Sequence, residues 1–446
     1  MSPEPTNNSR LRSIGSIVVG SLLLGLVLAI FLVLVPFAGA EENVISGSVL
    51  LAFALGWALI AVLSMRFTDQ PQRWAIAPAT LMAPAAAVML AWPDSVEHET
   101  FSWIWPPVLL ALVVWMIVRV RSDLRSRARA WLLYPLFAVL ALAAIGGAYE
   151  TVQERIDDGK YDMPGQLVDV GGHRLHLNCT GSGSPTVILE AGLGEPSVMM
   201  TGWIAPDVAK DTRVCAYDRA GRGWSESASG AQDGVAVATD LHTLIHNAGV
   251  EGPYVLAGHS AGGAYVLIFA NLYPAEVAGV VLLDSMSPNQ YEGVPSWPGF
   301  YRMWVRVSAL APSLARLGVL RLVEQFSFGT LPSEQRDRER AFWSTARHWR
   351  SQRDEFSTIR TTLREAGELK TLGAKPLIVL SAASGAEDGW MPLQDDLAKL
   401  STNSIHRVLA DATHASLTEE EGPAGKSAQA IRDVVASLRT ARPLAP

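Results

Sequence analysis

Residues 254–269 decide the fold and read Tyr-Val-Leu-Ala-Gly-His-Ser-Ala-Gly-Gly-Ala-Tyr-Val-Leu-Ile-Phe. The apolar run 254–257 predicts a buried strand, and the apolar run that ends at Phe269 predicts a helix. Between them lies a Gly-x-Ser-x-Gly pattern, whose small neighbours let strand and helix approach closely. Such a sharp turn exposes its serine above the sheet, so Ser260 is the candidate nucleophile.

A serine hydroxyl is a weak nucleophile until a neighbouring base accepts its proton. Nine histidines are available in the chain. His414 follows the last strand-like run, in a loop where the chain order Ser, acid, His places the base. His259 adjoins the serine, but the tight turn is expected to point it elsewhere, and we interpret it as structural. The predicted base is therefore His414.

Outward from this motif, short apolar runs alternate with helical or loop-rich stretches. The strand-like runs cover residues 166–170, 174–178, 186–190, 213–217, 254–257, 279–283, 377–381 and 405–409. The first two flank Gly171-Gly172-His173 and predict a hairpin. The alternation predicts a mainly parallel sheet covered by helices, with a closing helix at 424–439. The interval 286–371 is too long for a simple crossover and predicts a helical cap.

Over residues 163–440 the chain resembles the α/β-hydrolase fold family, which implies an eight-stranded, mainly parallel sheet with a helical cap and no cofactor. Besides the serine turn, Glu190-Ala191-Gly192-Leu193-Gly194 resembles the family's oxyanion loop, and residues 217–225 resemble its turn after the fourth strand. The family usually has His-Gly in the oxyanion loop, where this chain has Ala-Gly. Because backbone N–H groups donate there, the resemblance implies Leu193 and Ala261 as the oxyanion donors.

Two aspartates compete for the acid that orients His414. In many family members the acid follows the seventh strand, where Asp388 lies a few residues later than usual. Asp284 ends the strand after the nucleophile helix, and some members take their acid from this place. On spacing we prefer Asp284, with Asp388 as the alternative.

The chain has two cysteines, Cys179 and Cys215, near the ends of the second and fourth predicted strands. These strands are neighbours in the family's sheet order, so the resemblance makes a disulfide plausible in an oxidising compartment, with two buried free thiols as the alternative. No metal-ligand spacing is visible in the sequence.

Residues 1–150 differ in composition from the rest and predict an all-α transmembrane region. Five runs without Lys, Arg, Asp or Glu are each long enough to span a membrane: about 13–38, 44–65, 75–92, 101–118 and 130–149. Pro106 and Pro107 interrupt the fourth run, so a re-entrant pair of segments is an alternative for the third and fourth. We expect a linker over 151–163 and the hydrolase domain over 164–446.

The arginines of residues 1–150 lie before the first predicted span, after the second and between the last two, whereas the other loops carry only acidic residues. This bias predicts a multi-pass protein of the cell membrane, with a cytoplasmic N-terminus and an extracytoplasmic hydrolase domain. Residues 1–150 contain nine Arg and nine acidic residues, so the net charge of −7 belongs to residues 151–446. Nucleic acid is therefore not an expected partner.

Together these features predict a membrane-anchored esterase that cleaves a small-molecule or lipid-like ester through an acyl-enzyme. Thioesterase, peptidase and cofactor-free peroxidase activities are alternatives, because a fold does not fix a substrate. Serine at the turn disfavours epoxide and haloalkane hydrolysis, for which this family uses Asp. A hydrolase-like membrane receptor is the alternative from another class, but it has no need of nucleophile, base and oxyanion loop together.

Overall fold

The computed structural model describes residues 14–91, 99–123, 133–326 and 329–445. The chain divides into two compact units. One comprises Met1–Gln153 and Ser313–Val319, and the other comprises Glu154–Pro312 and Leu320–Pro446. The division between Gln153 and Glu154 falls inside the segment expected to be a linker.

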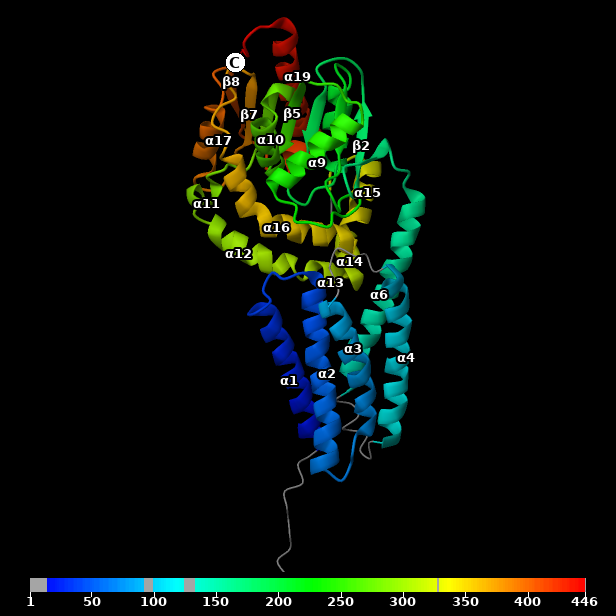
Figure 1. Ribbon diagram of the computed structural model, residues 1–446. Helices are drawn as coiled ribbons and strands as arrows, with labels where there is room; N and C mark the ends of the chain where they lie inside the picture. Colours follow the sequence, from blue (N-terminus) through cyan, green and yellow to red (C-terminus); the bar gives the residue numbers. More distant parts are fainter. Residues whose placement is uncertain (1–13, 92–98, 124–132, 327–328, 446) are drawn as a thin grey trace, which may run out of the picture. The chain divides into compact units, whose positions relative to one another are not determined.

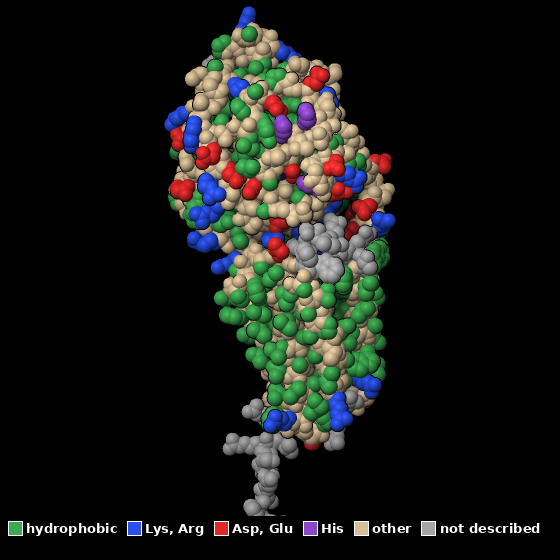
Figure 2. Space-filling view, in the orientation of Figure 1, with side chains coloured by type: hydrophobic (Ala, Val, Ile, Leu, Met, Phe, Trp, Pro, Cys, Tyr) green, Lys and Arg blue, Asp and Glu red, His purple; other side chains and the backbone are tan. Residues whose placement is uncertain are grey.

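The first unit is built from long apolar helices. Its helices are α1 (Ile14–Leu34), α2 (Glu42–Phe67), the short η1 (Arg73–Ala75), α3 (Ile76–Ala91), α4 (Glu99–Asp123) and α6 (Tyr134–Lys160). Within the described residues, five helical segments are long and apolar enough to cross a membrane. Figure 2 shows hydrophobic side chains covering the middle of the visible face of these helices. A surface of this kind favours a hydrocarbon environment.

Helix α4 continues through Pro106 and Pro107, so the fourth apolar run forms a single helix. Pro106 has no N–H to donate to the carbonyl of Ser102, four residues earlier. The hydroxyl of Thr151 on α6 donates to that carbonyl instead, at 3.2 Å. A neighbouring helix thus replaces the hydrogen bond that the proline removes.

The expected linker is also largely helical. Residues 151–160 form the last part of α6, and only the residues after Lys160 leave the helix. Between Glu150 and Asp158 the chain has neither proline nor glycine and includes good helix formers such as Gln153, Glu154 and Arg155. The helix therefore extends beyond the apolar run that marked its position in the sequence.

The second unit contains an eight-stranded sheet in the order β1-β2-β4-β3-β5-β6-β7-β8. Its strands are β1 (Gln166–Asp169), β2 (Arg174–Thr180), β3 (Val187–Glu190), β4 (Val214–Tyr217), β5 (Tyr254–His259), β6 (Val277–Leu283), β7 (Leu377–Ala382) and β8 (Ser404–Leu409). The β1–β2 hairpin and the β2–β4 pair are antiparallel, and all other neighbours are parallel. The predicted fold class is confirmed.

Helices cover both faces of the sheet (Figure 1). Leu256, Val280 and Val379 belong to the core on the face covered by α9 (Gly234–Asn247), α10 (Ala261–Leu272) and α17 (Trp390–Ala398). Their neighbours Val255, Val281 and Ile378 belong to the core on the opposite face, covered by α7 (Val198–Thr201), α8 (Ile204–Val208), α18 (Ser416–Glu419) and α19 (Glu421–Thr440). Because both faces are covered, β3, β4, β5 and β7 consist entirely of buried residues.

Helices fill the interval between β6 and β7, where the cap was predicted. They are α11 (Gln290–Gly293), α12 (Trp297–Ser308), α13 (Ala311–Arg316), α14 (Val319–Glu324), α15 (Ser333–Trp343) and α16 (Ala346–Ala366). A short helix, η2 (Pro274–Glu276), precedes β6. Helices α12 and α16 pack side by side (Figure 1). The segment Ser313–Val319 belongs to the first unit, where the Arg316 guanidinium pairs with the Glu42 carboxylate.

Candidate active site

Ser260 lies between β5 and α10, in a backbone conformation that non-glycine residues rarely adopt. Its φ is 53° and its ψ is −122°. The turn is fixed by hydrogen bonds from its N–H to Leu283 O (3.0 Å) and from Met286 N–H to its carbonyl (2.8 Å). A strained, well-supported turn is what a nucleophile needs to project from the end of a strand.

The glycines around Ser260 are required by close packing. A Cβ on Gly258 would lie 2.5 Å from the backbone of Gly262, and one on Gly262 would lie 2.4 Å from Glu190 O. A Cβ on Gly263 would lie 1.9 Å from Ser285 Oγ. Strand β5, helix α10 and the end of β3 therefore approach closely enough to place Ser260 beside the 191–195 loop.

The structure brings His414 and Asp284 together from different loops. His414 follows β8, Asp284 follows β6, and His414 Nδ1 lies 2.6 Å from Asp284 Oδ2. The Asp284 side chain is 4% exposed and that of His414 is 46% exposed. With Nδ1 donating to the carboxylate, Nε2 is the ring nitrogen left for proton transfer. Asp388 is exposed in the loop before α17, and the structure places Asp284 against the histidine.

Two further groups hold the Asp284 carboxylate. Trp390 Nε1–H donates to Oδ1 at 2.8 Å, and the backbone N–H of Ala382 donates to the same oxygen at 3.2 Å. Asp284 itself has a φ of 44°, which turns its side chain out of the sheet at the end of β6. Trp390 was not identified from the sequence. Its only signal was a position at the start of a helix that follows the seventh strand.

The 191–195 loop carries the expected oxyanion donor Leu193 between two N–H groups with carboxylate partners. Gly192 N–H donates to Glu195 Oε2 at 2.7 Å, and Gly194 N–H donates to Glu355 Oε2 at 2.8 Å. Ala261 is the first residue of α10, where an N–H has no acceptor within its own helix.

His259 makes an ion pair beside His414. His259 Nδ1 lies 3.2 Å from Glu195 Oε2, and His259 Nε2 lies 3.2 Å from the carbonyl of His414. Burial alone lowers the pKa of His259, but the Glu195 carboxylate outweighs it and raises this pKa above its ordinary value. These contacts support a structural role for His259, because they tie the 191–195 loop to the loop of His414. Glu195 was missed in the sequence, where only its place after the oxyanion loop distinguished it.

A cavity of about 310 Å³ adjoins these groups and is mainly apolar. Its lining includes Leu193, Ser260, Asp284 and His414. The aromatic side chains of the lining are Trp297, Phe300, Phe356 and Trp390, and its polar side chains beyond the triad include Gln290, Ser384 and Glu387. The cap interval 286–371 holds Trp297, Trp304, Trp343 and Trp349, and of these only Trp297 is among the lining residues. A small apolar group next to a reactive oxygen fits such a cavity.

Cys179 and Cys215 occupy paired positions on the antiparallel strands β2 and β4 and form a disulfide. Among the residues that the structure describes, no group of three or more His, Cys, Asp or Glu is arranged to hold a metal ion.

Comparison with known proteins adds a family to this geometry. Residues 185–421 match the family model described as alpha/beta hydrolase fold. An uncharacterized protein of Schizosaccharomyces pombe is 28% identical over 368 residues, covering 74% of this chain and 64% of that protein. The 2-hydroxymuconate semialdehyde hydrolase of Pseudomonas sp. (strain CF600) is 29% identical over 166 residues, covering 37% of this chain and 55% of that protein. The chain thus spans less than two thirds of the length of these curated relatives.

Among solved structures, the Cif epoxide hydrolase from Acinetobacter nosocomialis superposes with a TM-score of 0.52 at 16% sequence identity. The superposition covers 64% of this chain and 96% of the hydrolase chain. At this identity the likeness shows the fold alone.

Proposed function

Because this chain belongs to the alpha/beta hydrolase fold family, we propose that it is a membrane-anchored serine hydrolase that cleaves carboxylic esters. One observation carries the proposal. Asp284 holds His414 at 2.6 Å, and both line one cavity with Ser260 on its strained turn. This combination supplies a nucleophile, a base and an orienting acid.

In the acylation step, Ser260 Oγ attacks the ester carbonyl carbon while His414 Nε2 accepts the hydroxyl proton. A C–O bond forms to the serine, and the carbonyl electrons move to the oxygen, which the N–H groups of Leu193 and Ala261 stabilise. The intermediate then collapses, the bond to the alkoxy group breaks, and His414 returns its proton to the leaving alcohol. Asp284 stabilises the imidazolium in between.

Water completes the cycle. It attacks the acyl carbon, gives one proton to His414, and forms a second tetrahedral intermediate in the same oxyanion site. Collapse of this intermediate releases the carboxylic acid and returns the proton to Ser260 Oγ. The reaction balances as ester plus water to acid plus alcohol, and no further reactant is required.

The cavity indicates the class of ester. Its aromatic and aliphatic lining favours an uncharged, apolar group next to the scissile bond, and its volume of about 310 Å³ favours a short or medium one. Small or lipid-like apolar esters are therefore the proposed substrates. A serine at position 260 supports ester hydrolysis over the epoxide hydrolysis of the structural neighbour, because this family uses Asp at the turn for epoxides.

The apolar helices support a role as a multi-pass anchor of the cell membrane. The arginine bias supports a cytoplasmic N-terminus and a hydrolase unit on the extracytoplasmic side. A disulfide between Cys179 and Cys215 fits that compartment. A reporter fused after residue 446 should be active outside the cytoplasm, and activity confined to the cytoplasm would overturn the orientation.

The test of the proposed function is hydrolysis of p-nitrophenyl esters of graded acyl length by the full chain in detergent. Wild type should hydrolyse part of the series, and Ser260→Ala should reduce the rate to the background of the buffer. Ser437→Ala, at a half-buried serine of α19 that does not line the cavity, is the matched control and should match wild type. The proposal is wrong if wild type hydrolyses no ester, or if Ser260→Ala keeps the wild-type rate.

A further inference from the structure

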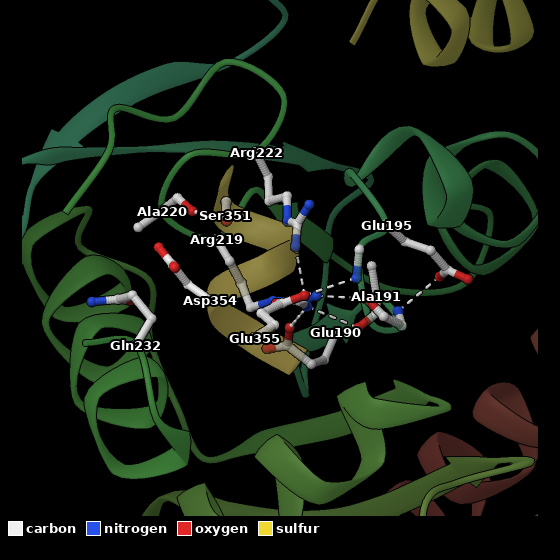
Figure 3. A network of polar contacts seen from close by, with 12 residues as sticks. Glu190, Ala191, Glu195, Arg219, Ala220, Arg222, Gln232, Ser351, Asp354 and Glu355 are labelled. Carbon is white, nitrogen blue, oxygen red and sulfur yellow. Dashed lines mark hydrogen bonds and ion pairs between the residues drawn. The ribbon is translucent and has the colours of Figure 1, made fainter. Parts of the chain in front are cut away.

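Four buried charged side chains meet behind the oxyanion loop (Figure 3). Glu190 ends β3, Arg219 and Arg222 lie in the turn after β4, and Glu355 comes from the cap helix α16. Each of these side chains is at most 4% exposed. The ester hydrolysis proposed above assigns none of them a part, although burying four charges is costly unless they serve one another.

Three ion pairs connect these four charged side chains. Arg219 Nε lies 2.6 Å from Glu355 Oε1, and Arg219 Nη1 lies 2.5 Å from Glu190 Oε1. Arg222 Nη2 lies 2.6 Å from Glu355 Oε2. Burial raises the pKa of Glu355, but Arg219 and Arg222 outweigh it and hold this pKa below its ordinary value. Glu355 is therefore a carboxylate at neutral pH and fixes the planar guanidinium of Arg219.

Arg219 also holds the backbone of the oxyanion loop. Its Nη1 donates to the carbonyl of Ala191 at 2.8 Å, and its Nη2 donates to the carbonyl of Gly192 at 2.5 Å. The carbonyl of Gly192 and the N–H of Leu193 belong to the same peptide plane and point in opposite directions in a trans peptide. By fixing the Gly192 carbonyl, Arg219 therefore fixes the direction of the Leu193 N–H.

Glu355 holds the peptide group on the other side of Leu193. Its Oε2 accepts the N–H of Gly194 at 2.8 Å, so it holds the peptide plane that follows Leu193. The loop is thus held through both peptide groups that flank Leu193, in one case directly by a cap residue and in the other through Arg219. An oxyanion donor requires such preorganisation, because its value depends on needing no reorganisation as charge develops.

The next residue of α16 connects this arrangement to the substrate cavity. Phe356 lines the cavity and stacks on Trp304 of α12, with ring centroids 5.8 Å apart. Neighbouring positions on one cap helix thus face the cavity and the oxyanion loop. A shift of α16 that altered the cavity would also move the Glu355 carboxylate.

We propose that Glu355 is a positioning residue which, directly and through Arg219, aims the Leu193 N–H at the oxyanion, so that cap helix α16 controls the chemical step as well as the shape of the cavity. The inference rests on the proposed function, since it assigns a role to the oxyanion loop of that reaction. It also gives the cap a part in catalysis that a lid over the cavity would not have.

The test is Glu355→Gln in the full chain, assayed with an ester that wild type hydrolyses. The amide removes the charge that fixes Arg219, so kcat per active site, titrated with a fluorophosphonate, should fall about 10- to 100-fold. KM should change less than about threefold, because Glu355 does not line the cavity. A trifluoromethyl ketone, which mimics the tetrahedral intermediate, should lose affinity by about the same factor as kcat.

Glu365→Gln is the matched control. Glu365 lies on the same helix, and its Oε2 accepts the backbone N–H of Val235 at 3.1 Å, at a site that does not contact the oxyanion loop. This variant should keep wild-type kcat and KM. If Glu355→Gln does not fold, Arg219→Lys takes its place, because lysine keeps the charge but lacks the planar fork that reaches both carbonyls.

The outcomes separate the two proposals. Active wild type with unchanged kcat per titrated site in Glu355→Gln, or in Arg219→Lys where the first does not fold, overturns the positioning role and leaves the hydrolase proposal standing. A rise in KM alone also overturns it, because it shows a role in binding. Wild type without esterase activity overturns both proposals.

Discussion

Replacement of Asp284 by Asn tests how the base is oriented. The Asn oxygen can still accept from Trp390 Nε1–H and Ala382 N–H, as Asp284 Oδ1 does at 2.8 and 3.2 Å. Its amide nitrogen then faces His414 Nδ1, where in wild type the carboxylate accepts a hydrogen bond at 2.6 Å. Two donors cannot share this hydrogen bond, so the ring must carry its proton on Nε2 and cannot accept the proton of Ser260.

The expected loss is large, because the variant changes the tautomer and also removes the counterion of the imidazolium. An orienting aspartate of this kind is worth about 10⁴-fold in kcat, or about 5 kcal/mol at 1.36 kcal/mol per factor of ten. The assay is the hydrolysis rate of the best ester of the graded series, per folded molecule. Since the buried hydrogen bonds at Oδ1 persist, the melting temperature should change little.

Asp388→Asn is the matched control for this prediction. Asp388 is exposed, so its replacement should change kcat less than about threefold. The reasoning is refuted if Asp284→Asn keeps more than about a tenth of wild-type kcat. It is equally refuted if Asp388→Asn causes the loss and Asp284→Asn does not, because the acid would then be the other aspartate.

Three further predictions concern stability, measured by thermal unfolding of the full chain. Burial and nearby carboxylates raise the pKa of Glu339 to about 8, so the free energy of unfolding should be highest below about pH 4.5 and fall by a few kcal/mol as the pH rises to about 8. Glu339→Gln should flatten this pH dependence, and an unchanged dependence would contradict the assignment. Gly262→Ala, whose Cβ would lie 2.4 Å from a backbone carbonyl oxygen, should lower the free energy of unfolding by about 2–3 kcal/mol. Gly425→Ala in α19, with open space around it, should raise it by about 0.5–1 kcal/mol, and equal effects would contradict the close packing of the turn. Reduction of the disulfide between Cys179 and Cys215, 36 residues apart, should cost about 3–4 kcal/mol, and alkylation of two thiols in the unreduced protein would contradict the bond.

Much of the fold was readable because its signals are local. Residues 187–189 and the strand Leu377–Ala382 are buried on both faces, and such stretches consist of consecutive apolar or small residues that stand out between glycine-rich turns. The Gly171-Gly172 hairpin has φ values of 101° and 118°, which glycine adopts without cost. The extension of α6 through residue 160 was missed, because helix propensity carries it beyond the apolar pattern.

The residues of the candidate site also differ in whether a local sequence signal marks them. Ser260 and His414 are marked by a local motif and by their order in the chain. The choice between Asp284 and Asp388 depends on which loop reaches the histidine; spacing favours Asp284, but only the structure places its carboxylate against His414. The pairing of Arg219 with Glu355 joins residues 136 positions apart. Arg219 lies in the turn 217–225 that resembles the family's, but nothing in the sequence indicates that Glu355 is its partner. Contacts of this kind follow from the packing of the cap and have no local signature.

Covalent labelling is the most direct test of Ser260 as an activated nucleophile. The full chain is treated with a fluorophosphonate, digested, and mapped by mass spectrometry. We expect one phosphonylated residue, Ser260, with no adduct in Ser260→Ala and slow labelling in His414→Ala, which lacks the base. An unlabelled wild type, an adduct on another residue, or equal labelling of Ser260→Ala would contradict it.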